Sequence, residues 1–417
     1  MLDIKLIRQN PDKVKEKLAQ KGSDPVLIDE LLSLDGDRRK LLQEIETVRH
    51  KKGEAEEKLS SADKDDNIIK TLKEVKLFLD FKEKELSDLE EKIDKVTHHL
   101  PNLPLDDVPM GKNEQDNIVI KEVGKKPVFK FPAKDYLELG EKLDIIDVKR
   151  ASKTSGSRFG FLKNQAAILE FALVQFALNK LIKNGFKPII PPVLIKPEMF
   201  KGMGYIDNSD EEMYLLEKDN LYLVGTSEQI IGPMHVDEAF NEKELPCRYI
   251  SFSSCFRREA GSYGKDTKGI LRVHQFDKLE MFVFSKPEES LKEQQLMLKM
   301  EEELMKELGI AYRVVRICAS ELSQPSASSY DIEAWLPGQK VYKETHSNSN
   351  CTDFQARRLN IRYRRNNETG YVHTLNGTAF AMGRTIIAIL ENYQQKDSSI
   401  RIPKCLLPYT IGLRVIR

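Results

Sequence analysis

Hydrophobic positions between residues 28 and 100 recur in alternating steps of three and four. The first run covers residues 31–59 and the second covers residues 72–100, and in both the apolar positions form a narrow stripe between charged ones. A stripe of this spacing is typical of helices that pack as a coiled coil. The polar stretch 60–67 joins the two runs, which predicts an antiparallel helical hairpin with helices of about 45 Å each.

The charge on this predicted arm leaves its role open. Residues 28–100 carry 20 acidic and 15 basic side chains, although cations cluster at 38–40, 49–52 and 70–76. Lysines and arginines at such a spacing could bind RNA phosphates, but they could equally form solvated faces. From periodicity alone, a dimerisation or spacer coiled coil is the favoured interpretation.

The second part of the chain has a different pattern. A proline-rich, polar stretch at 101–117 ends the second helix and forms a linker. Beyond it, short β-type runs follow one another across polar loops, which indicates antiparallel pairing and an α+β fold. Apolar-periodic segments at 163–184, 288–308 and 377–394 are predicted helices that cover the sheet. The predicted strands lie at 221–224, 249–252, 270–284, 312–318, 330–336 and 341–342.

The composition narrows the class of protein. The 417 residues suffice for two or three domains, and 66 Lys and Arg balance 66 Asp and Glu, so the global charge does not bear on nucleic acid binding. The five cysteines are scattered without a C-x-x-C pair, which predicts a reducing compartment and no zinc site. The N-terminus is charged from residue 3, and polar residues interrupt the apolar stretch 166–182. We therefore expect a soluble, cytoplasmic protein without a membrane span.

Charged and aromatic residues that could form a binding or catalytic site are concentrated in residues 255–280, "CFRREAGSYGKDTKGILRVHQFDKLE". The glycines and lysine do not have the spacing of a phosphate-binding P-loop, so side chains would have to bind any phosphate. Side-chain alternation predicts that Arg257 and Glu259 share one face of a strand, and that Phe276 and Glu280 share a face of the returning strand. A cation, an aromatic ring and a carboxylate on one face suit a nucleotide. A surface hairpin with cross-strand ion pairs is the alternative.

Two further groups of residues fit the same chemistry. Glu344 and Ser347, with His346 between them, carry oxygens that could ligate Mg²⁺ bridging phosphates. Arg384 lies near the start of an apolar helix, where a buried guanidinium needs an anion. A self-capping polar loop and a buried structural ion pair are the respective alternatives.

Together, these motifs resemble those of the seryl-tRNA synthetases, a class II aminoacyl-tRNA synthetase family, along nearly the whole chain. "GFKPIIPPVLI" (185–195) resembles the class II motif 1, residues 255–280 motif 2, and "GTAFAMGRTIIAILENYQ" (377–394) motif 3. "TSEQ" (226–229) is similar to the serine-pocket signature of the family, and "MLDIKLIRQNP" to its N-terminal start. Residues 320–329, 348 and 378–379 depart from the family pattern.

The resemblance implies a fold, an activity and partners. Residues 1–110 would form a tRNA-binding domain with the arm at 28–100, and residues 111–417 an antiparallel-sheet class II catalytic domain. The enzyme would activate L-serine with ATP and Mg²⁺ to seryl-adenylate and transfer it to the 3′ end of tRNA(Ser), with tRNA(Sec) as an open second substrate. The family is homodimeric, with motif 1 in the dimer interface, and its arm grips the long variable arm of the tRNA.

The resemblance also assigns residues to the substrates. Arg257 and Arg384 would be catalytic, and Glu344 and Ser347 would hold Mg²⁺. The expected serine contacts are Thr226, Ser227, Glu228, Arg257, Glu280, Asn376 and Thr378. The expected ATP contacts are Arg257, Arg258, Glu259, Val273, Phe276, Glu344, Thr345, His346, Ser347 and Arg384. Two alternatives stay open here: an inactive, RNA-binding paralogue, and an adenylate-forming ligase that charges a carrier protein.

Overall fold

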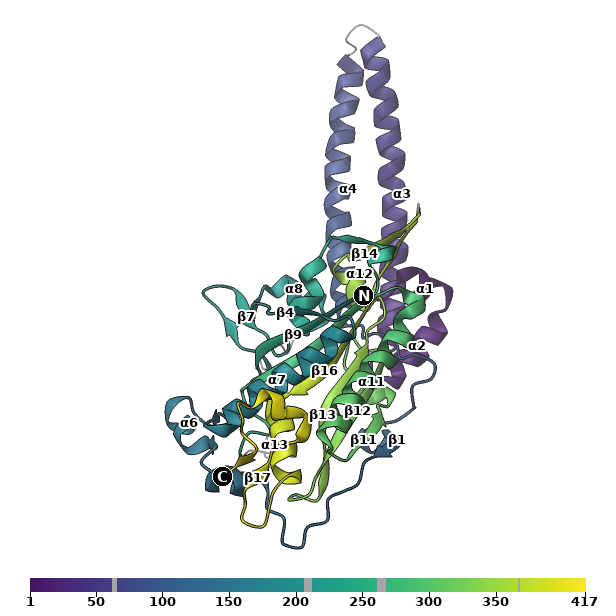
Figure 1. Ribbon diagram of the computed structural model, residues 1–417. Helices are drawn as coiled ribbons and strands as arrows, with labels where there is room; N and C mark the ends of the chain where they lie inside the picture. The colour runs from purple at the N-terminus through teal and green to yellow at the C-terminus, as the bar shows by residue number, and fades with distance from the viewer. Residues whose placement is uncertain (62–65, 206–211, 261–267, 367) are drawn as a thin grey trace. The chain divides into compact units, whose positions relative to one another are not determined.

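The computed structural model describes residues 1–61, 66–205, 212–260, 268–366 and 368–417. The chain divides into two compact units, Met1–Leu103 and Pro104–Arg417 (Figure 1). Part of the predicted polar turn at 60–67, and residues 261–267 of the motif 2 segment with two of its glycines, lie outside the described residues.

The described residues of the first unit form four helices and the short segments that join them. Asp3 caps α1 (Ile4–Gln9) by accepting a hydrogen bond from the Lys5 backbone N–H, and Pro11 opens α2 (Pro11–Gln20). The long helices are α3 (Val26–Ser61) and α4 (Asp66–His99). Arg8 of α1 forms an ion pair at 2.6 Å with Asp35 of α3, whose side chain is buried. This pair ties the short helices to the base of α3.

The arm follows the predicted seam. Leu41 and Ile45 of α3 and Leu79 of α4 are buried against one another, and the flanking seam positions are half-buried. Arg38 pairs with Glu90, and Arg49 with Glu83, at 2.8 Å each across the two helices. The predicted hairpin over 28–100 is therefore confirmed for the described residues.

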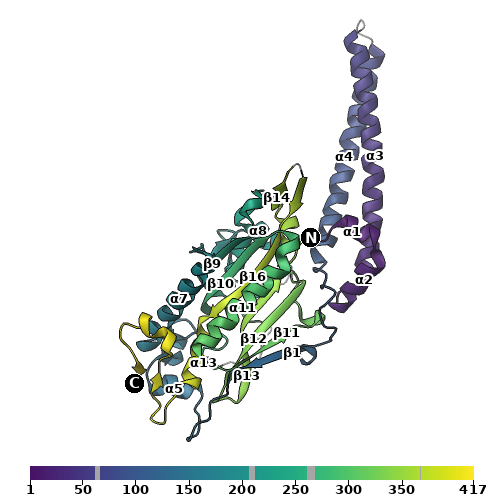
Figure 2. The same cartoon turned by 45° about the vertical axis from the view of Figure 1, so that its right-hand side comes forward.

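An eight-stranded sheet forms the centre of the second unit (Figure 2). Neighbouring strands pair antiparallel, except that β4 lies parallel to β9, so the predicted α+β class is confirmed. In sheet order the strands are β1 (Ile118–Val123), β11 (Tyr312–Arg316), β12 (Ser328–Leu336), β13 (Val341–Asn350), β16 (His373–Ala381), β10 (Gln275–Ser285), β9 (Cys247–Phe256) and β4 (Lys187–Ile189).

Three helices, α7 (Gln165–Lys183), α11 (Ser290–Leu308) and α13 (Met382–Asn392), pack against the sheet (Figures 1 and 2). Gly377 of β16 faces α11, where an added Cβ would lie 2.7 Å from an oxygen of Glu301. Because side chains alternate along a strand, its neighbours Asn376 and Thr378 point to the opposite face, where they line a pocket. Helices thus cover one face of the central strands and the other face carries the pocket.

Smaller elements surround this core. The remaining helices are α5 (Tyr136–Lys142), α6 (Val148–Thr154), α8 (Pro197–Gly202), α10 (Glu228–Ile231) and α12 (Phe354–Arg358). The remaining strands are β2 (Ile146–Asp147) with β3 (Phe161–Leu162); β5 (Leu194–Ile195), β6 (Leu215–Leu216) and β7 (Leu221–Leu223); β8 (Ala239–Asn241), β14 (Arg362–Arg365) and β15 (Glu368–Tyr371); and β17 (Ile400–Arg401) with β18 (Val415–Ile416).

Three predictions about elements were wrong in part. The helix predicted from residue 377 begins at Met382, because 377–381 complete β16, a central strand buried on both faces whose apolar run does not alternate. The strand predicted from residue 270 begins at Gln275. Arg257 and Glu259 follow the end of β9 rather than sharing a strand face, since Glu259 adopts a left-handed φ of 53°.

The polar segment at 343–350 also differs from its prediction. The sequence predicted a strand only at 341–342, with a self-capping loop as the alternative beyond it, whereas β13 continues to Asn350. Its polar residues pair with β12 along their whole length and with β16 near the end of the strand. A strand built from serine, threonine and asparagine side chains has no apolar alternation, and its hydrogen bonds become visible only in the sheet.

Helix α7 contains the most apolar stretch of the chain. By length and composition alone it could cross a membrane, contrary to the expectation drawn from its polar interruptions. Its buried side chains include Leu169, Leu173 and Leu181, which belong to the main hydrophobic core. A core helix of this kind passes the same length and composition test, so this observation is weak evidence for a span.

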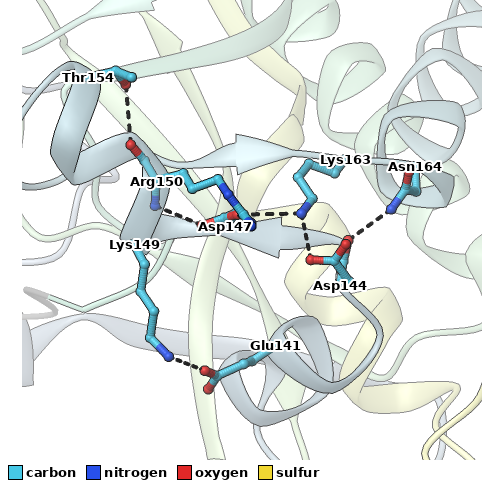
Figure 3. Close-up of polar contacts among 8 residues, drawn as sticks. All are labelled: Glu141, Asp144, Asp147, Lys149, Arg150, Thr154, Lys163 and Asn164. Carbon is cyan, nitrogen blue, oxygen red and sulfur yellow. Dashed lines mark hydrogen bonds and ion pairs between the residues drawn. The ribbon is translucent and has the colours of Figure 1, made fainter.

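A polar network connects the β2–β3 strand pair to the helices beside it (Figure 3). Asp147 caps α6 by accepting from the Arg150 backbone N–H at 2.8 Å and also pairs with the side chains of Arg150 and Lys163. These hydrogen bonds from Arg150 lower the pKa of Asp147 to about 2. Arg158, in the loop between α6 and β3, then donates to the Glu259 backbone carbonyl at 3.2 Å. This last hydrogen bond connects the loop between α6 and β3 to the segment that follows β9.

Candidate active site

A pocket of about 600 Å³ lies on the sheet face that the three helices leave uncovered. Its floor is formed by β10, β13 and β16, and its walls by the segments after β7 and β9, the loop before β10 and the start of α13. Central strands fix the floor residues rigidly, which suits a site that must hold reacting groups in position.

Strand β10 supplies an alternating row of pocket residues. Phe276, Lys278 and Glu280 all face the pocket, as the alternation predicted for the first and last of them. The guanidinium of Arg257 lies 5.3 Å from the centre of the Phe276 ring, and its Nε donates to the Gly225 carbonyl at 3.1 Å. A flat ring and a carboxylate therefore stand along β10, and the guanidinium of Arg257, from the segment after β9, lies beside the ring.

Glu280 is the most unusual carboxyl group of the pocket. Its side chain is 2 % exposed and forms an ion pair with Lys278, itself buried, while the Thr378 hydroxyl donates to it at 3.4 Å. Burial raises the pKa of Glu280 to about 7 despite the favourable charge of Lys278. Such a group can bind an ammonium or a hydroxyl in a site shielded from water.

A second buried carboxyl group lies next to it. Glu228, near the start of α10, accepts a hydrogen bond from the hydroxyl of Tyr205. Burial and the nearby charge of Glu228 raise the pKa of Tyr205 well above its usual value, so the phenol stays protonated and keeps donating. Thr226, also buried, completes this end of the pocket.

The opposite end of the pocket carries Glu344, Ser347 and Arg384. Residues three apart on a regular strand face opposite sides, but the register of β13 shifts between Glu344 and His346, so Glu344 and Ser347 both reach the pocket. Arg384 Nη1 lies 3.1 Å from a Glu344 carboxylate oxygen. Burial opposes the charge on Glu344, yet Arg384, Arg257 and Lys278 together hold its pKa below the usual value. An ionised carboxylate and a hydroxyl suit a divalent cation that shares phosphate oxygens.

The loop before β10 closes the third side. Arg272 pairs with the Glu259 carboxylate at 2.8 Å, and the backbone around Val273 lines the pocket with Ile270 and Leu271. The left-handed backbone at Glu259 turns its side chain toward this loop instead of continuing β9. Together with the Phe276 ring, these groups form a slot with polar ends, a shape suited to a planar heterocycle.

Most residues predicted for the site come together here. The predicted residues that line the pocket are Thr226, Glu228, Arg257, Glu259, Val273, Phe276, Glu280, Glu344, Thr345, Ser347, Asn376, Thr378 and Arg384. They come from segments up to 158 residues apart in the sequence.

Three predicted residues lie elsewhere. Ser227 is fully buried and its hydroxyl hydrogen-bonds to that of Ser251. Arg258 is exposed and its guanidinium lies 5.9 Å from the Tyr214 ring centre. His346 points into the helix-covered side of β13, where burial lowers its pKa to about 4. Each is a sequence neighbour of a pocket residue, but its own side chain points away from the pocket.

The sequence interpretation missed several pocket residues. Lys278 could have been found, because it lies between Phe276 and Glu280 in the alternating row. Tyr205, Ser323 and Pro325 also line the pocket, but they come from loops without a periodic signal; Arg272 lies in a loop that the sequence analysis predicted as a strand. Only the folded chain brings these loops to the site.

The positions that depart from the family pattern have defined surroundings. Thr378 keeps its hydroxyl on Glu280, and Ser328 accepts from Arg316 at 2.7 Å in the buried interior of β12. Asn348 is buried on the α11 side of β13, opposite Gly377, and its side-chain N–H donates to the Gln294 carbonyl. Thr378 therefore keeps a polar group in the pocket, whereas Ser323 and Pro325 of the departing segment 320–329 line the pocket themselves.

Comparison with known proteins gives a consistent result. The model of the seryl-tRNA synthetase N-terminal domain matches residues 1–104, and that of the class II tRNA synthetase core domain (G, H, P, S and T) matches residues 214–393. The serine–tRNA ligase of Acidothermus cellulolyticus is 42 % identical over 419 residues, covering 100 % of this chain and 99 % of that protein. The serine–tRNA ligase of Pyrococcus horikoshii is 43 % identical over 438 residues, covering 98 % and 96 %.

Solved structures agree with these matches. The crystal structure of seryl-tRNA synthetase from Pyrococcus horikoshii complexed with ATP superposes with a TM-score of 0.94 at 42 % identity, covering 100 % of this chain and 99 % of that one. The cytoplasmic serine–tRNA ligase from Naegleria fowleri in complex with AMP gives 0.90 at 32 % identity with the same coverage.

Proposed function

Because the chain belongs to the seryl-tRNA synthetase family and is a serine–tRNA ligase, we propose that the pocket on β10, β13 and β16 is where it activates serine with ATP. The observation that carries this proposal is the combination of Arg257, Arg384 and the buried Glu280 in one pocket. Two cations suit a triphosphate, and a buried carboxylate suits a small polar amino acid.

The reaction needs positioning and charge neutralisation rather than a protein nucleophile. The serine carboxylate attacks the α-phosphorus of ATP in line, and pyrophosphate leaves. Arg257 neutralises the α-phosphate and the attacking carboxylate, and Arg384 contacts the γ-phosphate. The adenine ring stacks on Phe276, with its amine at Glu259 and the backbone of Val273. Holding both reactants at this geometry supplies much of the rate enhancement.

Glu344 and Ser347 would hold Mg²⁺ beside the phosphates, and Thr345 lies between them in the pocket wall. The lowered pKa of Glu344 supports this assignment, because a hard cation needs an ionised oxygen ligand. The ion would neutralise phosphate charge. Arg384 keeps the Glu344 carboxylate oriented while no substrate is bound.

Serine is held by polar groups that alanine and glycine cannot satisfy. The hydroxyl end of serine is surrounded by Glu280, Thr378 and Asn376. Its amine end is surrounded by Thr226 and Glu228. A substrate without the hydroxyl leaves buried partners unpaired, which disfavours it strongly. Threonine must be excluded by the space beside Thr378 rather than by hydrogen bonding.

The arm binds tRNA(Ser), and we extend this proposal to tRNA(Sec) as a second substrate. Removal of residues 35–95 should abolish tRNA charging and leave serine-dependent ATP–pyrophosphate exchange intact, because the pocket lies entirely in the other unit. Equal loss of both activities would contradict the assignment of tRNA binding to the arm and of serine activation to the other unit. Charging of a tRNA(Sec) transcript by the full chain tests the second substrate.

The active form is a cytoplasmic homodimer that joins through the motif 1 segment. Ile190 in this segment is 88 % exposed, and Phe171 of the neighbouring helix α7 is 69 % exposed. Apolar side chains this exposed are typical of a surface that a partner covers. Light scattering of the Ile190→Asp variant should report a monomer; a dimer of unchanged stability would place the interface elsewhere.

Exchange of pyrophosphate into ATP, with serine, threonine, alanine and glycine offered separately, tests the pocket assignment. We expect exchange with serine alone, and its loss in Arg257→Ala. A variant as active as the parent would show that the chemistry takes place outside this pocket.

A further inference from the structure

The outer face of α4, which comprises Lys70, Lys73, Leu77, Phe81 and Lys84, is an unusual surface of the arm. At 100° per residue these five side chains fall within about 80° of one another. They lie on the side opposite the seam that contains Leu79. The face therefore points to solvent and contributes nothing to packing between α3 and α4.

Two large apolar side chains occupy the middle of this face. Leu77 is 70 % exposed and Phe81 is 66 % exposed, one helical turn apart. Leu77 and Phe81 do not stabilise the pairing of α3 with α4, since the seam already buries the apolar residues that hold the two helices together. Exposed apolar side chains that cluster rather than scatter indicate a contact surface.

The lysines of this face differ from most cations of α3. On α3, Arg39 and Lys40 pair with Asp35 and Asp37, and Arg49 pairs with Glu83. Among the residues that the structure describes, no carboxylate pairs with Lys70, Lys73 or Lys84. Residues 70–84 carry five lysines and three carboxylates, whereas Val26–Ser61 carries seven lysines and arginines and nine carboxylates. The sequence alone did not distinguish these clusters, and the ion pairs do.

We propose that the outer face of α4 is the RNA-contacting face of the arm, with its lysines on phosphates and Leu77 and Phe81 against exposed base or ribose surfaces. This inference rests on the proposed binding of tRNA by the arm and adds which side of it makes the contact. Unpaired lysines suit a polyanion, and apolar side chains between them suit bases that are not covered by stacking. A second copy of the chain would bring like charges together, so RNA is the better match.

The test compares two sets of variants of the full chain. The first set changes the face: Leu77→Ser with Phe81→Ser, and separately Lys70→Gln, Lys73→Gln and Lys84→Gln together. The matched control, Arg39→Gln with Lys40→Gln, removes two cations from α3. Filter binding of a tRNA(Ser) transcript over a salt series, serine-dependent pyrophosphate exchange and light scattering are measured for each variant.

In both face variants, the Kd for the transcript should rise about tenfold or more. The lysine variant should also lose about 0.7–0.9 in the slope of log Kd against log salt for each lost contact. The control and all exchange activities should stay within twofold of the parent.

Three results would overturn the inference. They are normal RNA binding by both face variants, a larger loss in the control, or a change of oligomeric state without a change in RNA binding. The arm deletion separates this failure from that of the proposed function. If deletion of residues 35–95 abolishes charging while the face variants bind normally, only the choice of face is wrong.

Discussion

Glu280→Gln is the most informative change in the pocket, because it keeps the shape of the side chain and removes its charge. Glu280 is 2 % exposed, and burial raises its pKa from 4.5 to about 7. That difference corresponds to about 3 kcal/mol of preference for the neutral acid. This net preference already includes the pairing with Lys278, which lowers the pKa of Glu280 and opposes the effect of burial.

Serine binding uses the ionised form of Glu280, so kcat/KM for serine should rise with pH up to about 7 and then level off. The variant cannot ionise at this position and should lack that inflection. Removing one charged partner from a buried polar contact costs about 2–5 kcal/mol, and we expect kcat/KM to fall by a factor between about 30 and about 5,000. The change should also leave the ammonium of Lys278 buried without its anion, which lowers stability.

The assay is serine-dependent ATP–pyrophosphate exchange between pH 5.5 and 8.5, with thermal unfolding measured on the same samples. Glu302→Gln is the matched control, because Glu302 is a buried carboxylate of α11 that pairs with Lys121 outside the pocket. The control should keep the inflection near pH 7. An inflection that persists in Glu280→Gln, or activity within threefold of the parent, would refute the reasoning.

Three further outcomes are expected. Arg384→Gln should raise the KM for ATP at least tenfold by exchange assay, because it removes the cation beside Glu344; an unchanged KM would exclude the contact. Gly377→Ala should lower the free energy of unfolding by about 1–3 kcal/mol in urea, since the new Cβ would lie 2.7 Å from Glu301 and 2.8 Å from Met297. Burial holds the pKa of Glu301 well above its usual value, so the native state keeps its proton and stability falls as pH rises above 4.5. Glu301→Gln should reduce that slope in thermal unfolding between pH 5 and 8.

The sequence by itself determined the arm and the identity of most pocket residues. The seam at 31–59 and 72–100 is visible because helical periodicity places residues three and four apart on one face, and the short polar connection leaves the two helices to pair with each other. The motif residues Arg257, Glu280 and Arg384 could be named because each lies in a segment whose residue types match a known pattern. The family itself is confirmed by the comparisons.

Only the tertiary structure decided how these residues meet. The shifted register in β13 puts Glu344 and Ser347 on one side, and the left-handed turn at Glu259 ends β9 before the predicted strand face can form. Lys278 and Glu280 are two residues apart on β10, but both become buried only because β9 and β16 pair on either side of that strand. These features depend on hydrogen bonds and burial between segments far apart in the chain, and local periodicity carries no information about such pairings.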